Sequence, residues 1–256
     1  MEIELEHIIE SKQKKSSVHT SRTMMLAELS KVLDYSSGTN TNFETLLSEN
    51  VIAKQTQTNK SATNKYLRQL YLLDDSEPIF KVFHYFWSMA TANEKPILAL
   101  LLAITRDFLL AESIDTVINT SHANRVDVSA IELCIESNHP KRYTNKTRLS
   151  LAQNIASSWK QTGHITGKMK NIRTQVTPGY YSVAYALFLG YIHGLRGDFL
   201  FKTKWTKVLD CSENELRNLA QEAAKRELLS FHYAGNVTVV NFKTLIQKLN
   251  LHGITD

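Results

Sequence analysis

Basic residues gather in one long stretch of this chain that contains no carboxylate. The sixty-one positions from Ser137 to Gly197 carry nine Lys or Arg and no Asp or Glu. The whole chain has 30 basic and 25 acidic residues, so this segregation is more informative than the net charge of +5. Because no acid within the stretch neutralises its positive potential, it suits a polyphosphate partner, although a merely solvated basic face has the same composition.

The first candidate patch for nucleic-acid binding lies inside this stretch. Its members precede or lie on an expected helix over 144–162, or follow it in a short basic hairpin. They are Lys141, Arg142, Lys146, Arg148, Lys160, Lys168, Lys170 and Arg173. Gly163 is typical of a helix C-cap, and the segments HIT, GKMKN and IRTQV predict a strand, a turn and a second strand. We expect the hairpin, as a wing beside the helix, to grip phosphates.

A second candidate patch lies nearer the N terminus, where no acid occurs between Val51 and Leu73. Its members are Lys60, Asn64, Lys65 and Arg68. Asn64, Lys65 and Arg68 share one polar face of a helix expected over 61–73, capped by Ser61. Side chains of these types can reach base edges or phosphates.

A third region, over 213–228, is a weaker candidate for binding DNA. Three cations, Arg217, Lys225 and Arg226, share the expected helix with four glutamates, Glu213, Glu215, Glu222 and Glu227. Phosphate repels carboxylates, so packing or a protein partner fits this helix better than a DNA groove.

The elements that must position these patches are mostly helices, as the nine Gly and four Pro suggest. Apolar spacing predicts helices over 21–33, 42–54 and 61–73, which is the outline of a helix-turn-helix, and a long buried helix over 94–114. We expect strand only in hairpins near 164–176 and 228–242. The predicted fold class is all-α dominated with small β-hairpins, with helix-turn-helix and winged-helix units packed on the central buried helix. The expected parts are 1–75, 76–177 and 178–256.

Motifs of catalysis and cofactor binding are missing from the sequence. It contains no GxGxxG, HExxH or GxSxG, and residues 163–169 form a P-loop-like run that is one residue short and lacks the Ser or Thr that would hold magnesium. Cys134 and Cys211 lack metal or disulfide spacing. We therefore expect no enzyme, no cofactor and no metal, and, because no apolar run approaches the roughly 20 residues of a membrane helix, a cytoplasmic protein without a membrane or small-molecule partner.

The order of four segments resembles the BrxA-like family of bacterial BREX phage-exclusion systems. The segments are SRTMMLAELSKVL, SATNKYLRQLYLL, TRDFLLAESI and KTRLSLAQNIASSWKQTGHI, and the likeness covers roughly residues 20–176. It implies a mostly helical protein that binds double-stranded DNA and serves phage defence without catalysis. The chain beyond residue 177 departs from that family's compact members.

Together these features predict a DNA-binding, non-catalytic accessory protein of a phage-defence system, with double-stranded DNA and other defence proteins as partners. Two alternatives stay open. One is a protein-interaction scaffold that uses winged-helix units, and the other is an RNA-binding protein, although no aromatic strand motif of the RNA-recognition type occurs.

Overall fold

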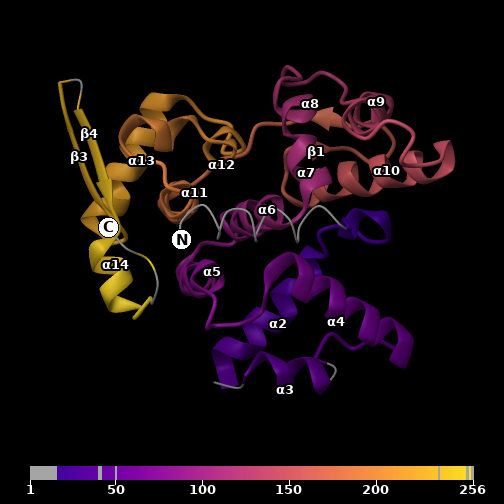
Figure 1. Ribbon diagram of the computed structural model, residues 1–256, viewed down its shortest axis with the longest axis horizontal. Helices are drawn as coiled ribbons and strands as arrows, with labels where there is room; N and C mark the ends of the chain where they lie inside the picture. The colour runs from indigo at the N-terminus through magenta and orange to yellow at the C-terminus, as the bar shows by residue number, and fades with distance from the viewer. Residues whose placement is uncertain (1–15, 40–41, 50, 236, 252–253, 255–256) are drawn as a thin grey trace. The chain divides into compact units, whose positions relative to one another are not determined.

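The computed structural model describes residues 16–39, 42–49, 51–235, 237–251 and 254 (Figure 1). It divides into two compact units, each built from two separate pieces of chain. The first unit takes in the described residues up to Asp75 together with Leu102–Gln175, and the second takes in Ser76–Leu101 and Val176 onward. Both basic patches fall within the first unit.

The first unit begins with three helices after a single turn of 3-10 helix. These are η1 (Val18–Thr20), α2 (Leu26–Thr39), α3 (Phe43–Ser48) and α4 (Gln57–Tyr71). Asn42 and Thr56 cap α3 and α4 with their side-chain oxygens. Helix α4 therefore starts four residues before the expected Ser61, because Thr56 satisfies the N–H of Asn59. The expected helix over 42–54 is shorter than predicted and ends at Ser48.

The remaining helices of the first unit lead into the first hairpin. They are the end of α6 (Lys95–Arg106), α7 (Phe108–Glu112), α8 (Ile114–Ile118), α9 (Val128–Asn138) and α10 (Asn145–Gln161). Strands β1 (Ile165–Thr166) and β2 (Ile172–Arg173) then pair antiparallel.

The second unit holds α5 (Pro78–Met89), the start of α6 and the C-terminal elements. These are α11 (Tyr180–Ile192), η2 (Gly197–Lys202), α12 (Lys204–Lys207), α13 (Glu213–Lys225), β3 (Ser230–Ala234), β4 (Val237–Asn241) and α14 (Lys243–Lys248). Strands β3 and β4 pair antiparallel from Ser230–Asn241 to Ala234–Val237. The expected all-α-dominated class with small hairpins is confirmed, since both sheets of the described chain are two-stranded hairpins.

The prediction of one long helix over 94–114 was wrong in its extent, because α6 ends at Arg106. Residues 97–104 of α6 are all buried, as expected of a central helix. Asp107, however, adopts an extended conformation and accepts the N–H of Leu110 as the N-cap of α7. The apolar pattern continues across this break, so periodicity alone could not reveal it.

Asp107 is also the buried anchor of the N-terminal segment. Its carboxylate accepts hydrogen bonds from the Ser17 hydroxyl and the Val18 N–H, each at 2.8 Å, and lies 3.0 Å from Nδ1 of His19. Burial alone would raise the pKa of the Asp107 carboxyl, but the charge and hydrogen bonds of His19, Ser17 and the Leu110 N–H outweigh it and lower that pKa. The ionised form is therefore the one that the fold stabilises.

Helix α11 is the core of the second unit. Every residue from Ser182 to Tyr191 is buried, which is typical of a helix surrounded by others. The buried carboxylate of Glu94 accepts the N–H groups of Tyr181 and Ser182 at the start of this helix. Gly179 leaves the room for it, since a Cβ there would lie 2.2 Å from a Glu94 oxygen.

In the described part of the chain, no helix combines the length and apolar character needed to cross a lipid bilayer.

Replacing Asp107 with Asn should destabilise the first unit by about 3 kcal/mol at pH 7, because His19 loses a buried charged partner. The carboxyl's pKa is lowered in the folded protein, so its stabilisation is present above the unfolded value of about 3.9 and is lost as the pH falls through the folded value. The difference between wild type and Asp107→Asn, measured by urea denaturation, should therefore shrink as the pH falls below about 4. Asp127→Asn is the control, because its pair with Arg125 is exposed and should cost less than about 1 kcal/mol. An unchanged difference at low pH would contradict this account of Asp107.

Replacing Gly179 with Ala should destabilise the second unit by about 1 to 3 kcal/mol, because the new methyl group displaces the Glu94 carboxylate. The backbone at Gly179 (φ −117°) accepts alanine without strain, so the steric conflict is the cause. A double-mutant cycle in denaturant tests this. In a Glu94→Ala background the same change at position 179 should cost only a few tenths of a kcal/mol, whereas an equal cost in both backgrounds would place the effect elsewhere.

Candidate nucleic-acid interface

Helix α10 has two covered sides. One side buries Leu151, Ile155 and Trp159 in the core of the first unit. A second side binds the N-terminal segment: Asn154 donates to the His19 carbonyl, and the Ser158 hydroxyl accepts the Met24 N–H and contacts His19. These contacts prevent α10 from rotating about its axis, so they determine which way its remaining side faces.

The third side of α10 is open and carries no acid. Lys146, Ser150 and Gln153 follow one another at i, i+4 and i+7 and are exposed, and Leu149 beside them is exposed as well. Lys160 continues this side two turns further on and is half-buried. Among the described residues, Lys146 and Lys160 form no ion pair, so their charges are available to a ligand.

Arg148 points away from this open side and is neutralised. Its guanidinium pairs with Glu136 and approaches Glu132 at 3.9 Å, both on α9, and its Nη2 donates to the side chain of Asn145. The side chain is only 20% exposed. The acid-free stretch of sequence therefore still has acids next to it in the fold, because Glu132 and Glu136 of α9 lie just before the stretch and contact it.

The turn between α9 and α10 carries the next two candidates. Lys141 is exposed and has a left-handed backbone (φ 60°), with its N–H donated to Glu136. Arg142 is also exposed, and its guanidinium lies 5.4 Å from the ring centres of both Phe108 and Tyr143. The lysine charge faces solvent beside the start of α10, and the arginine is held by aromatic rings.

The tip of the β1–β2 hairpin carries Lys168 and Lys170, both exposed and without an ion pair among the described residues. Gly167 allows the tight turn, because its φ is +95° and a Cβ there would lie 2.2 Å from the carbonyl oxygen of Lys170. The expectation of a basic hairpin tip at this place is confirmed by the position of these two lysines.

Arg173 does not belong to the surface patch, so the expectation that it lies on phosphates with Lys168 and Lys170 was wrong. Its side chain is fully buried. The Nε atom donates to the Val117 carbonyl at 3.0 Å, and Nη1 donates to the carbonyls of His164 and Thr174. A lone Arg after a turn gave no sign of this, because the burial depends on the Val117 carbonyl, 56 residues away in the sequence.

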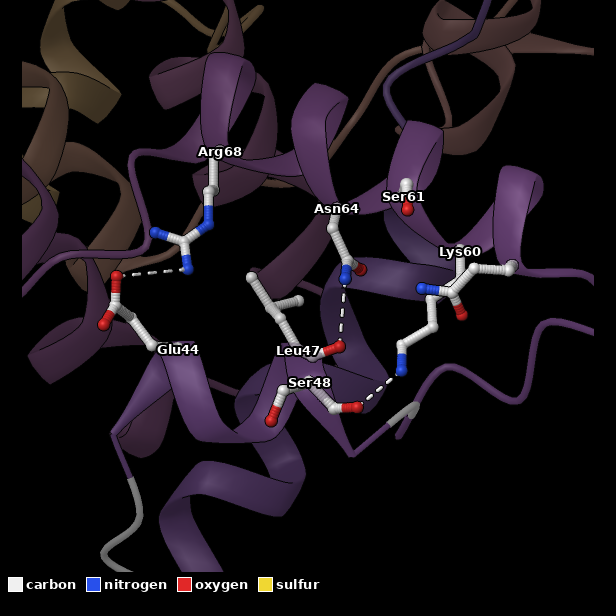
Figure 2. A pocket seen from close by; sticks show the side chains of 8 residues that line it. Glu44, Leu47, Ser48, Lys60, Ser61, Asn64 and Arg68 are labelled. Carbon is white, nitrogen blue, oxygen red and sulfur yellow. Dashed lines mark hydrogen bonds and ion pairs between the residues drawn. The ribbon is translucent and has the colours of Figure 1, made fainter.

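The second candidate patch is largely used within the fold (Figure 2). The Asn64 side chain donates to the Leu47 carbonyl at 2.9 Å, the Lys60 ammonium donates to the Ser48 carbonyl, and Arg68 lies 3.9 Å from Glu44. These side chains line a shallow hollow of about 380 Å³ between α3 and α4. Lys65 alone of the four is exposed and away from α3, with its ammonium 5.9 Å from the ring centre of Tyr66.

The cations of α13 are paired with acids, as expected of the weaker patch. Arg217 binds Asp198 and Glu213 and lies between the rings of Phe201 and Tyr233. Lys225 and Arg226 both pair with Glu222. Arg217 thus joins α13 to η2 and to the β3–β4 hairpin, which makes it a structural residue.

Sequence reasoning missed a segment of chain that pairs with the first hairpin through a single isolated β-bridge. Residues 123–126 run along β2: Arg125 bridges Ile172 in antiparallel register, the Ala123 N–H binds the Arg173 carbonyl, and the Val126 N–H binds the Asn171 carbonyl. The segment HANRV carries no strand pattern, so only the tertiary partner defines it.

Three other kinds of site find little support in the described residues: a hydrolytic triad, a reactive thiol and a metal centre. Ser158, His19 and Asp107 follow one another like a hydrolytic triad, but all three are buried, and the serine oxygen is bound by the Met24 N–H and the Asn154 carbonyl. Burial raises the pKa of the Cys134 thiol and raises that of Cys211 to about 12, which disfavours a thiolate nucleophile. No group of three His, Cys, Asp or Glu suited to a metal occurs in the part of the chain described.

No protein-family model, no curated protein and no solved structure matches this chain.

Replacing Arg173 with Ala should lower the free energy of unfolding by about 3 kcal/mol, because at least two buried carbonyls lose their donor and a large side chain leaves the core. The double variant Lys168→Ala/Lys170→Ala should change that free energy by less than about 0.5 kcal/mol, since both side chains lie at an exposed tip. Urea denaturation of the three proteins measures both effects. If wild type and Arg173→Ala were equally stable, the account of Arg173 as a buried structural residue would be contradicted.

Proposed function

We propose that this chain binds double-stranded DNA without catalysis, with α10 in the major groove and the β1–β2 hairpin beside it. The observation that carries the proposal is the order and pairing of elements in the first unit. Helix α8 is followed by the segment 123–126, then α9 and α10, then β1 and β2, with Arg125 of the segment bridged to Ile172 of β2. This is the order of a winged helix, in which the third helix reads DNA and the hairpin is the wing.

The open side of α10 suits a DNA groove in shape and chemistry. A helix of 17 residues is about 25 Å long, and the major groove is about 12 Å wide and admits it. Gln153 is of the type that binds adenine with two hydrogen bonds, and the exposed Leu149 can contact a thymine methyl group. The absence of acid on this side removes the repulsion that α13 would meet.

Phosphate contacts can form at both ends of this surface. At the start of α10, Thr144 caps a first turn that contains no acid, so the positive end of the helix adds to the charges of Lys141 and Lys146. At the other end of the segment, Lys168 and Lys170 lie on the hairpin tip. Contacts of this kind set the position of the helix, while its polar side chains read bases.

The second unit repeats the same order of elements with different chemistry, which favours a protein partner for that unit. Helix α11, η2 packed on β4, α12, α13 and the β3–β4 hairpin follow one another. Its hairpin exposes apolar side chains, Tyr233, Val237 and Val239, and the cations of α13 are ion-paired. A winged helix with this surface fits the interaction-scaffold alternative better than it fits phosphate.

RNA binding is the less favoured alternative for the first unit, because the major groove of an RNA duplex is too deep and narrow for a helix to read. The setting in phage defence, as an accessory protein of a BREX-like system, rests on the resemblance of residues 20–176 alone. Its test is the plating efficiency of phage on hosts that carry such a system with and without this chain.

Titration of labelled duplex DNA, single-stranded DNA and duplex RNA at several salt concentrations tests the proposal. We expect the tightest binding to duplex DNA. The variant Lys146→Ala/Lys168→Ala/Lys170→Ala should reduce the slope of log affinity against log salt by about 2 to 3, since each lost phosphate contact removes about 0.9 released counterion.

The control is Lys202→Ala/Lys225→Ala/Lys243→Ala, which removes the same net charge from exposed positions of the second unit. It should leave the salt slope within about 1 of the wild-type value, as only the long-range field changes. A larger loss in the control than in the α10–hairpin variant would refute this assignment. Absence of salt-sensitive binding to any nucleic acid would favour the scaffold.

A further inference from the structure

The hairpin tip presents an apolar side chain between its two lysines. Met169 is 91% exposed, the highest exposure of any large apolar side chain among the described residues. Lys168 and Lys170 on either side of it are also exposed. Single exposed apolar residues are common on protein surfaces, so the exposure of Met169 becomes informative only through its surroundings.

The base of the hairpin is held firmly on both sides. Arg173 anchors β2 to the Val117 carbonyl beneath it, and its own N–H binds the Asn124 carbonyl. The Thr174 hydroxyl donates to the Gly163 carbonyl at 2.7 Å, which ties the end of the hairpin to the end of α10. Together with the tight turn at Gly167, these bonds make the tip a projection on a rigid support.

We propose that Met169 inserts into the minor groove and wedges between two adjacent base pairs, so that the protein bends the DNA it binds. This inference rests on the proposed function. It adds a specific side chain, a specific groove and a deformation of the duplex that the phosphate contacts alone do not require.

Charge complementarity favours the minor groove of DNA as the binding partner of this tip. The groove is about 6 Å wide and is walled on both sides by phosphates, so a single side chain such as Met169 can enter it while the backbone of the hairpin tip stays outside. A lysine on each side of Met169 can then neutralise one wall each. Methionine is among the apolar residues that proteins insert between base steps at the minor groove, where they kink the duplex by about 20–90°.

The chain contains a matched apolar residue that lacks these surroundings. Leu133 on α9 is 69% exposed, but it lies directly after Glu132, and Glu136 follows one turn later. Phosphate would be repelled there, so Leu133 is a fair example of a solvated surface residue. It therefore serves as the control for the loss of an exposed apolar side chain.

The experiment uses the full chain and a 30-base-pair duplex with a fluorescent dye at each end and a flexible TA step at its centre. The bend of the duplex is measured at saturating protein by energy transfer between the dyes. Affinity is measured separately by anisotropy at several salt concentrations. Wild-type protein should raise the energy transfer, because bending brings the ends together. Met169→Ala should remove at least half of that rise and weaken binding roughly three- to tenfold, as an apolar contact is lost.

The other variants separate a wedge from a general surface effect. Met169→Leu should keep most of the rise, because leucine also serves as a wedge, and Leu133→Ala should match wild type. All three should keep the wild-type salt slope, since no cation is removed.

Equal energy transfer for wild type and Met169→Ala would overturn the wedge while leaving DNA binding intact. Failure of wild-type protein to bind the duplex at low salt would overturn both the wedge and the proposed function.

Discussion

A single buried carboxylate connects the pieces of the first unit. Asp107 ends α6, caps α7 and accepts hydrogen bonds from the N-terminal segment at Ser17 and Val18, while His19 connects it to Ser158 on α10. The cost of burying a charge is offset only when donors surround it, as they do here. Because the same network holds one side of α10, the direction of the proposed recognition surface depends on a buried residue that lies outside that surface.

Local patterns in the sequence predicted most helices and both hairpins. Apolar spacing, Gly163 after α10 and the alternation around β3 and β4 are signals carried by neighbouring residues. Features made by distant partners were missed: the break at Asp107 depends on Ser17, 90 residues away, and the burial of Arg173 depends on the Val117 carbonyl. The start of α4 was misplaced for a smaller reason, since Thr56 and Ser61 are both acceptable caps by type and the backbone places the cap at Thr56.

The candidate site shows the limit of counting charges along a chain. The acid-free stretch drew attention to α10 and the hairpin, yet Glu132 and Glu136 from outside it neutralise Arg148, and the Arg173 side chain is buried. On α4, three of the four polar candidates bind backbone or a carboxylate of α3, because a polar face that looks free in a helix projection can be the face on which a neighbouring helix sits. The lysines at the hairpin tip remain available because an exposed turn offers them no carboxylate.

The division of each unit into two pieces has a consequence for how the chain is made. Helix α5 leaves the ribosome early, but its aromatic side chains, among them Phe83 and Phe86, pack against Tyr185 on α11 in the second unit. The intervening residues complete a different unit, so translation must add on the order of 90 residues before that partner emerges. At a synthesis rate of about 5 to 20 residues per second, the aromatic side chains of α5 wait about 5 to 20 seconds for their partner on α11.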